Sequence, residues 1–254
     1  MPTNPSDVRI GIYGNDSPNT TATICRHPGL WALGYAGSVS ACEAVPIDLF
    51  APTGDHTWGD ILEEIDGVVL AGFTDPADRH PAHEEALVKY CRERSLPLLA
   101  IDQGMHILNN AFGGTVQEDL ARDRPEALQH RQPPEDDIRH AINVYPDTLL
   151  ACTYGEGEVI VNSEHRGGID RVGRGFKVSG EALDGVVEAI EWINEGWFAL
   201  GIQWQPASAT SSGLDIQVFR TLIDMACNKT LAKPKPSPKL RRRLAKAAAA
   251  SAAA

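Results

Sequence analysis

The sequence predicts an α/β fold, in which a doubly wound and mainly parallel sheet has helices on both faces and is followed by a β-rich second half. Short apolar runs, typical of strands buried on both faces, alternate with helical patterns between residues 8 and 112. The most apolar run, residues 96–101, passes through one tight turn directly into an apolar helical segment. Beyond residue 140, strand patterns dominate. The alternation in the first half implies a parallel sheet covered by helices.

The expected elements follow in chain order. The first half contains strands at 8–13, 44–50, 68–71 and 96–101, and helices at 28–42, 57–65, 80–94 and 105–112. The polar, proline-containing segment 121–139 is expected to be a surface loop. Strands are then expected at 141–145, 159–162, 176–179, 186–192 and 198–204, and an amphipathic helix at 214–227 closes the domain.

Length and composition favour one soluble globular domain. The chain has 254 residues, of which 43% are hydrophobic and 22% charged. We expect residues 1–7 to form an N-terminal tail, residues 8–230 the domain, and residues 231–254 a basic tail rich in proline and alanine and disordered. No run approaches the ~20 apolar residues of a membrane span, and no secretory signal is evident, so we expect a cytoplasmic protein.

Charge and cysteine usage exclude several classes of function. The net charge is −11 although the tail is basic, so nucleic-acid binding is not expected except through that tail. The tail could equally contact a membrane or an acidic partner, or serve only as a solubilising end. The five cysteines form no CxxC pair, and no histidines show metal-ligand spacing. We therefore expect no metal and no cofactor.

The turn Asp102-Gln103-Gly104 has the layout of a nucleophile elbow. A buried strand ends, one residue is pushed out at the sheet edge, and a helix begins at once, with Gly104 permitting the tight turn. Ligands of parallel sheets bind beyond the carboxyl ends of the strands. Backbone N–H groups at the helix N-terminus can hold a developing oxyanion there. The side chain of Asp102 is therefore the first candidate for function.

The residues around this elbow resemble one family over most of the chain. Residues 97–110 read PLLAIDQGMHILNN, where the γ-glutamyl-γ-aminobutyrate hydrolase family, a group of class I glutamine amidotransferase-like peptidases, has PLLAICRGxQLxNV. Four further blocks agree in order: DGVVLAG at 66–72, VNSEHR at 161–166, DGVVEAIE at 184–191 and FALGIQWQP at 198–206. The resemblance implies a flavodoxin-like fold and a pocket for a γ-glutamyl amide.

The same resemblance shows that the catalytic residues are replaced. Family members use a cysteine nucleophile, which forms a γ-glutamyl thioester, a histidine base and a glutamate that orients the histidine. This chain has Asp102, Gln205 and Ala207 at the three positions. Glutamine has no pKa suited to proton transfer near neutrality, and alanine has no polar side-chain atom. The standard thiol mechanism is therefore excluded.

The candidate site residues follow from the elbow and the matching blocks. Asp102 and His165 are the catalytic candidates. Asp102 could act as a nucleophile or base, or it could bind a cationic ligand or cap the helix. His106 and His165 could pair with Asp102 for acid–base work or a metal, or simply line the pocket, and Trp204 could line the pocket or pack in the core. The expected ligand-binding residues are Gly72, Phe73, Gln103, His106, Glu164, His165, Arg166, Trp204 and Gln205.

Three functions remain open from the sequence. The first is a pseudoenzyme that binds a small amino-acid-like or γ-glutamyl ligand or a partner protein. The second is a divergent hydrolase or transferase that uses Asp102 with His165 or His106. The third is a regulatory protein docked by its basic tail onto a larger assembly. The sequence also leaves a homodimer open.

Overall fold

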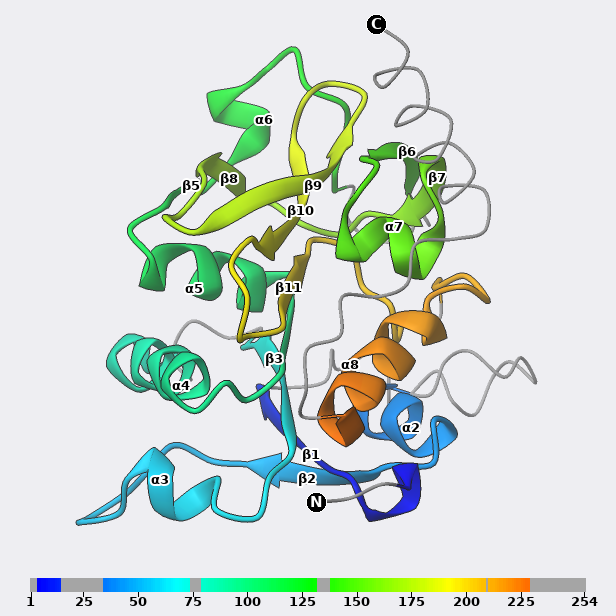
Figure 1. The fold of residues 1–254 in the computed structure, drawn as a ribbon. Coiled ribbons are helices and arrows are strands. Elements are labelled where there is room, and N and C mark those ends of the chain that lie inside the picture. Colours follow the sequence, from blue (N-terminus) through cyan, green and yellow to red (C-terminus); the bar gives the residue numbers. More distant parts are fainter. Residues whose placement is uncertain (1–3, 15–33, 74–78, 132–137, 209, 229–254) are drawn as a thin grey trace, which may run out of the picture.

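The computed structural model describes residues 4–14, 34–73, 79–131, 138–208 and 210–228. Within these residues, eleven strands form one sheet (Figure 1). The main strand order is β2-β1-β3-β4-β11-β10-β9-β6-β7. Its first five strands are parallel, which confirms the predicted doubly wound half. These strands are β1 (Arg9–Gly14), β2 (Val45–Leu49), β3 (Gly67–Gly72), β4 (Leu98–Ile101) and β11 (Ala199–Ile202).

Helices cover both faces of the parallel half. The helices α3 (Trp58–Ile61), α4 (Pro81–Glu93) and α5 (Gln103–Ala111) lie on one face, and α2 (Gly34–Ala41) and α8 (Ile216–Asn228) lie on the other (Figure 1). Successive residues of a strand point to opposite faces. Leu98 and Ala100 accordingly pack under α4 and α5, whereas Leu99 and Ile101 pack under α8. The run LLAI is thus apolar throughout because both of its faces are buried.

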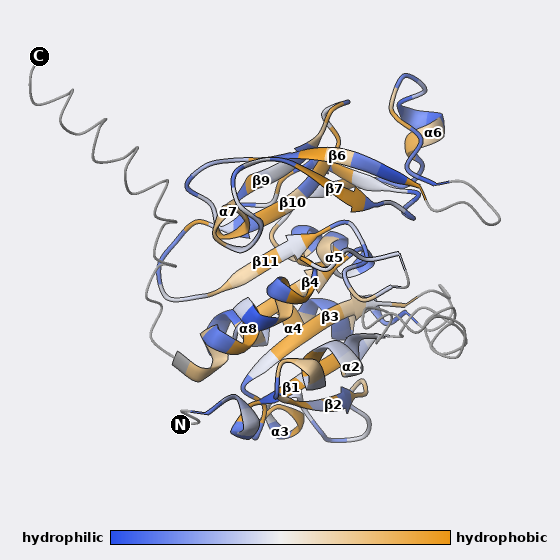
Figure 2. Cartoon of the chain, turned by 90° about the vertical axis from the view of Figure 1, so that its right-hand side faces the viewer, coloured by the Kyte–Doolittle hydropathy of each residue, from blue (hydrophilic) through white to orange (hydrophobic). Residues whose placement is uncertain are grey.

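The second half of the sheet is antiparallel. It contains β6 (Arg139–Val144), β7 (Gly157–Asn162), β9 (Phe176–Ala182) and β10 (Val187–Trp192), and β10 joins it to β11. In Figure 2 the hydrophobic colour is strong along β3 of the parallel half. The expected strands of the antiparallel half are therefore present, with shifted ends.

Several short elements were not expected. They are the 3₁₀ helix η1 (Pro5–Asp7), the strands β5 (Thr115–Gln117) and β8 (Gly168–Arg171), and the helices α6 (Leu120–Asp123) and α7 (Leu149–Tyr154). Helix α6 starts at Leu120 and extends into the predicted loop 121–139, because Asp119 accepts a hydrogen bond from the Arg122 N–H and caps the helix. Thr148 caps α7 in the same way. Elements this short have no periodicity that a sequence pattern could show.

Some expectations fall outside the described residues. Helix α2 begins at Gly34, and residues 28–33 of the expected helix lie outside the described part, as do residues 1–3 and 231–254 of the expected tails. Within the described ranges, no helix combines the length and apolar character needed to cross a membrane.

Candidate active site

The elbow at Asp102 has the geometry that the sequence predicted. Strand β4 ends at Ile101, Asp102 takes φ 50° and ψ −111°, and α5 begins at Gln103. A positive φ at a residue with a side chain costs of order 1–3 kcal/mol and persists only where the surroundings enforce it. The Asp102 N–H donates to the Ile202 carbonyl at 2.8 Å, and its own carbonyl accepts from Met105 N–H at 2.9 Å. Both bonds hold the turn in place.

Both carboxylate oxygens of Asp102 accept hydrogen bonds from side-chain amides. Gln203 Nε2 donates to Oδ1 at 2.9 Å, and Gln205 Nε2 donates to Oδ2 at 3.1 Å. Gln205 in turn accepts from the Tyr35 hydroxyl at 2.5 Å, and Gln203 Oε1 lies 2.8 Å from His106 Nε2. Asp102 and Gln205, at the positions where the resemblance expects a nucleophile and a base, are thus hydrogen-bonded to each other. Gln205 donates, and the Asp102 carboxylate only accepts.

This network fixes the proton on His106. A carboxylate offers no donor, so both glutamines turn their NH₂ groups toward Asp102. The oxygen of Gln203 then faces His106, whose Nε2 must carry the hydrogen. Burial lowers the pKa of His106 to about 4, so the ring is neutral at pH 7. The lone pair of the neutral ring is then on Nδ1, and Nε2 cannot act as a base in this network.

The charge on Asp102 is destabilised by its surroundings. Burial raises the pKa of Asp102 to about 6, although the charge of His165 and the glutamine amides act in the opposite direction. The carboxylate of Glu164 adds to the increase. A carboxyl group with a pKa near 6 is mostly ionised at pH 7.5 but takes up a proton just below neutrality.

The Gly72 segment lies against the elbow. Gly72 has φ +78°, and a Cβ built on it would lie 2.5 Å from Gln103 Cβ. This close approach brings the end of β3 to the start of α5, where oxyanion donors are expected in this fold. The neighbouring ring of Phe73 packs edge-to-face on Tyr13 at 5.2 Å between centroids. Phe73 therefore contributes to the core beside the elbow.

Trp204 occupies the core. Its side chain is fully buried, its indole N–H donates to Asp215 at 3.1 Å, and its ring packs edge-to-face on Tyr154. A ligand-binding role for this residue stays a prediction that its surroundings do not support. Ala207 is also buried, at 3% exposure.

The predicted residues of the segment 164–166 point in different directions. His165 is buried, and its Nδ1 lies 2.8 Å from the Gly167 carbonyl while its Nε2 faces Glu188 at 3.4 Å. Glu164 is exposed. Arg166 is exposed and pairs with Asp119 at 2.7 Å. Both ring nitrogens of His165 thus face groups other than Asp102, which weakens its assignment as a partner of that carboxylate.

Removing Arg166 should change stability little. The arginine side chain is 65% exposed, and solvent-exposed ion pairs contribute about 0–1 kcal/mol. We expect Arg166→Ala to lower the free energy of unfolding by less than about 1 kcal/mol, measured by urea denaturation. A larger loss would mean that the contact with Asp119 holds the loop before β8 in place.

Removing the Tyr35 hydroxyl should have a larger effect than the loss of a surface contact. Tyr35→Phe takes the donor away from Gln205 Oε1 in a buried setting. A hydrogen bond of this kind contributes about 1 kcal/mol net, and an orphaned acceptor costs more. We expect a loss of about 1–2 kcal/mol in urea denaturation. An unchanged midpoint would show that water satisfies the amide oxygen.

A separate cavity lies away from the elbow. It has a volume of about 650 Å³ and is lined by residues that include Asp66, Leu96, Pro97 and Phe198. These residues precede β3, β4 and β11, so the cavity lies at the amino-terminal edge of the sheet. Ligands of parallel sheets bind at the opposite edge, and Asp102 lies there. We therefore keep the elbow as the candidate site.

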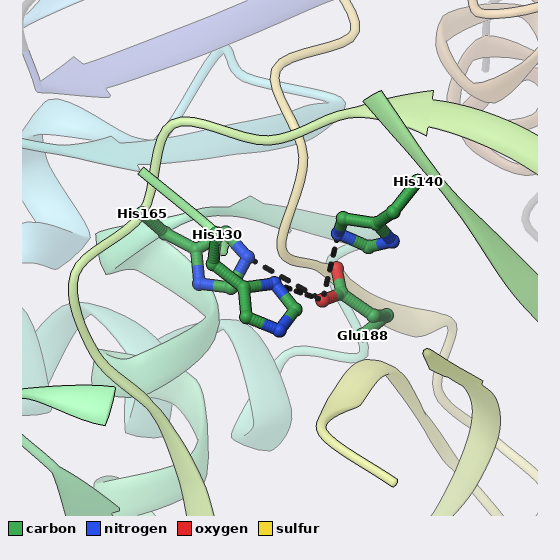
Figure 3. A group of neighbouring side chains, drawn as sticks. All are labelled: His130, His140, His165 and Glu188. Atoms are coloured by element: carbon green, nitrogen blue, oxygen red, sulfur yellow. Dashed lines mark ion pairs between the residues drawn. The ribbon is translucent and has the colours of Figure 1, made fainter. Parts of the chain in front are cut away.

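The structure also reveals a polar cluster that the sequence did not predict. His130, His140 and His165 surround Glu188 in the antiparallel half, and we call these four residues the histidine–glutamate cluster (Figure 3). They come from the segment after α6, from β6, from the loop after β7 and from β10. Consecutive members are 10, 25 and 23 residues apart, which shows no ligand pattern. The sequence feature that could have indicated this cluster is Glu188, a glutamate in the strand VEAIEW, where it is buried.

The fold and the elbow are those of a class I glutamine amidotransferase-like domain in which Asp102 occupies the elbow position. A model of the Peptidase C26 family matches residues 9–207, and the chain belongs to this family. The putative glutamine amidotransferase-like protein RP404 of Rickettsia prowazekii is 28% identical over 247 residues, which covers 74% of this chain and 86% of the relative.

Two further similarities agree with this assignment. The γ-glutamyl-γ-aminobutyrate hydrolase PuuD of Escherichia coli K12 is 32% identical over 168 residues, covering 58% of this chain and 65% of the relative. A crystal structure of a putative GMP synthase component from Thermoplasma acidophilum superimposes with a TM-score of 0.56 at 15% identity, covering 86% of this chain and 94% of that one. The latter supports the fold alone.

Proposed function

We propose that this protein is a non-hydrolytic member of the Peptidase C26 family, which uses the altered elbow pocket to bind a small amino-acid-like or γ-glutamyl ligand or a partner protein. The observation that carries the proposal is the pairing of Asp102 with the amides of Gln203 and Gln205, at the place where the family has a nucleophile and its base. A thiol mechanism needs both groups.

No described group near Asp102 replaces the lost base. Gln205 cannot accept a proton near neutrality. His106 donates its Nε2 hydrogen to Gln203, and burial keeps its pKa at about 4. The buried Ala207 cannot orient a base. Among the described groups at this contact, the Asp102 carboxylate itself is therefore the one ionisable group that a bound water molecule or nucleophile could use. That carboxylate is already hydrogen-bonded to two amides.

The charge of the site favours an ammonium group. Each carboxylate oxygen can accept more than one hydrogen bond, so Asp102 keeps acceptor capacity beside the two amides. Asp102 as a whole residue is intermediate in burial, and its carboxylate is ionised above its pKa of about 6. An α-amino group would compensate the poorly solvated charge, as opposite charges do at short range. This supports an amino-acid-like ligand rather than an anionic one.

Binding can be tested directly with a defined panel. The parent and its Asp102→Ala variant would be titrated by calorimetry with glutamine, γ-glutamyl amides, and the same amides with a blocked α-amino group. The proposal expects binding of at least one unblocked compound by the parent, and a loss in the variant or on blocking the amine. Equal binding of blocked and unblocked compounds would contradict the role of Asp102 as the ammonium acceptor.

A divergent hydrolase remains the second candidate because Asp102 sits on a strained elbow and has a raised pKa. In that scheme an Asp102 oxygen attacks an amide carbonyl, the C–N bond breaks as the amine takes a proton from His165 or His106, and water then cleaves the mixed anhydride and returns a proton to that histidine. Turnover in ¹⁸O-water would place the label in the Asp102 carboxylate when water attacks at that carbon. When water attacks the substrate carbonyl instead, the label appears in the released acid, so mass spectrometry that finds no label in either the Asp102 peptide or the released acid would remove this candidate.

A further inference from the structure

The histidine–glutamate cluster is buried and unusually polar. The side chains of His130, His140 and His165 are 2%, 6% and 2% exposed, and that of Glu188 is 0% exposed. Neither oxygen of Glu188 has a hydrogen-bond partner, and His140 Nε2 and His165 Nε2 have none. Buried polar atoms without partners cost several kcal/mol and are rare in folded proteins. Three of these atoms, Glu188 Oε1, His140 Nε2 and His165 Nε2, face one another in the core.

The outer nitrogens of the three rings all face oxygen acceptors. His130 Nε2 lies 2.9 Å from the Asp184 carboxylate, His165 Nδ1 lies 2.8 Å from the Gly167 carbonyl, and His140 Nδ1 lies 3.4 Å from the Ala141 carbonyl. A carbonyl or carboxylate only accepts, so the outer nitrogens of His130 and His165 carry the hydrogen, whereas the 3.4 Å contact of His140 is too long to fix its tautomer. In a neutral imidazole the inner nitrogen then has its lone pair free. Histidine ligands of metals show this same outer support.

The inner atoms have the spacing of a coordination shell. Glu188 Oε1 lies 3.5 Å from His130 Nδ1, 3.4 Å from His140 Nε2 and 3.4 Å from His165 Nε2 (Figure 3). These distances exceed the 2.7–3.2 Å that is typical of N–H···O hydrogen bonds. In a tetrahedral site with bonds of about 2.0–2.2 Å, neighbouring ligand atoms lie about 3.3–3.6 Å apart. The Ser163 hydroxyl, 3.4 Å from His130 Nδ1, donates instead to the His130 carbonyl at 2.8 Å.

We propose that the histidine–glutamate cluster binds one divalent transition-metal ion of the Zn²⁺ type through His130 Nδ1, His140 Nε2, His165 Nε2 and Glu188 Oε1. The four donor atoms lie within 4.8 Å of one another, so binding draws the rings together around the ion. Three imidazoles and one carboxylate are a ligand set that suits zinc and related ions. With all three rings neutral and no cation bound, three nitrogen lone pairs and a carboxylate would repel one another in a buried site.

The ion would have a structural role. Four protein ligands fill a tetrahedral shell and leave no open position for a substrate. The ligands join two strands, β6 and β10, to two connecting segments. One of these segments continues to Gly167, where an added Cβ would lie 3.5 Å from the His106 ring of the elbow helix. Metal binding would thus fix the position of the antiparallel half next to the candidate site. This inference does not depend on the proposed function.

The test uses the full chain without an affinity tag, dialysed against a chelator and titrated with Co²⁺ and then Zn²⁺. The proposal expects about one equivalent of metal per chain by elemental analysis, d–d absorption of tetrahedral Co²⁺, and a higher thermal midpoint when metal is restored. Binding of less than about a tenth of an equivalent with no shift of the midpoint would overturn it. The cluster would then hold a proton shared between histidine and Glu188.

Variants separate this site from adventitious histidine binding. Glu188→Gln should reduce binding to below about a tenth of an equivalent, whereas the exposed His56→Gln should bind as the parent does. Asp184→Asn, which weakens the outer support of His130, should lower the affinity about 10- to 100-fold. His140→Cys should add a thiolate-to-cobalt charge-transfer band. Equal binding by Glu188→Gln and the parent, or a cobalt spectrum in His140→Cys that matches the parent's, would overturn the ligand assignment.

Discussion

Gly104→Ala is expected to disrupt the fold more than any other single methyl addition at the elbow. A Cβ on Gly104 would lie 1.8 Å from the Leu70 carbonyl oxygen and 2.7 Å from its carbon. Both are backbone atoms of the buried strand β3, so no side-chain rotation relieves the contact. Overpacking commonly costs 1–3 kcal/mol, and we expect at least about 4 kcal/mol here because backbone must move. Urea denaturation followed by circular dichroism measures the loss.

Gly113→Ala is the matched control at the other end of the same helix. Gly113 has φ +79° with no heavy atom within 4 Å of its ideal Cβ, so the substitution should cost only about 1 kcal/mol of backbone strain. If both variants lose the same stability, the close packing of α5 on β3 is not what holds the elbow in place.

Asp102→Asn should gain stability relative to the parent as the pH rises. The pKa of Asp102 rises on folding from 3.8 to about 6, so the folded state binds the proton more tightly than the unfolded state does. The parent therefore loses stability as the pH rises from about 4 to about 6, and the uncharged asparagine does not. At 1.36 kcal/mol per pH unit, the variant should improve by up to about 3 kcal/mol relative to the parent between pH 4 and pH 7.

The informative quantity is the change with pH of the stability difference between the variant and the parent. Replacing a carboxylate oxygen by an amide group adds a further cost in stability, but that cost does not depend on pH. Asp60→Asn provides a control of opposite sign: hydrogen bonds from the backbone and side chain of Thr57 lower the pKa of the exposed Asp60. Its variant should lose stability relative to the parent as the pH rises. If the stability difference between Asp102→Asn and the parent did not change with pH, the Asp102 carboxylate of the parent would be well solvated in the folded state.

Most of the fold could be predicted because long, two-sided burial leaves a clear pattern. The runs around Leu70 and Leu99 are apolar on both faces, and they form the central parallel strands. The strands β5 and β8 could not be predicted in the same way. Their support comes from the long-range contacts of Asn109, whose amide donates to the Thr115 and Arg171 carbonyls and accepts from Gly173 N–H. A single buried asparagine leaves no periodic signal.

The candidate site was predicted in part. The elbow at Asp102 and its contact with Gln205 follow from motif order, since parallel strands end at one edge. The burial of Trp204 and the attachment of Arg166 to Asp119 depend on side-chain partners far away in sequence. The histidine–glutamate cluster was missed, and no metal was expected, because antiparallel pairing brings together residues 130, 140, 165 and 188 without any short spacing between them.

The central claim is that the elbow has lost its hydrolytic chemistry while keeping its scaffold. The most direct measurement is a mass-spectrometric turnover assay with glutamine, γ-glutamyl amides and other small amides, run on the parent and on Asp102→Ala at high protein concentration. We expect no product above the rate without protein for either chain. Hydrolysis by the parent that is lost in Asp102→Ala would contradict it and would identify Asp102 as the centre of a rebuilt active site.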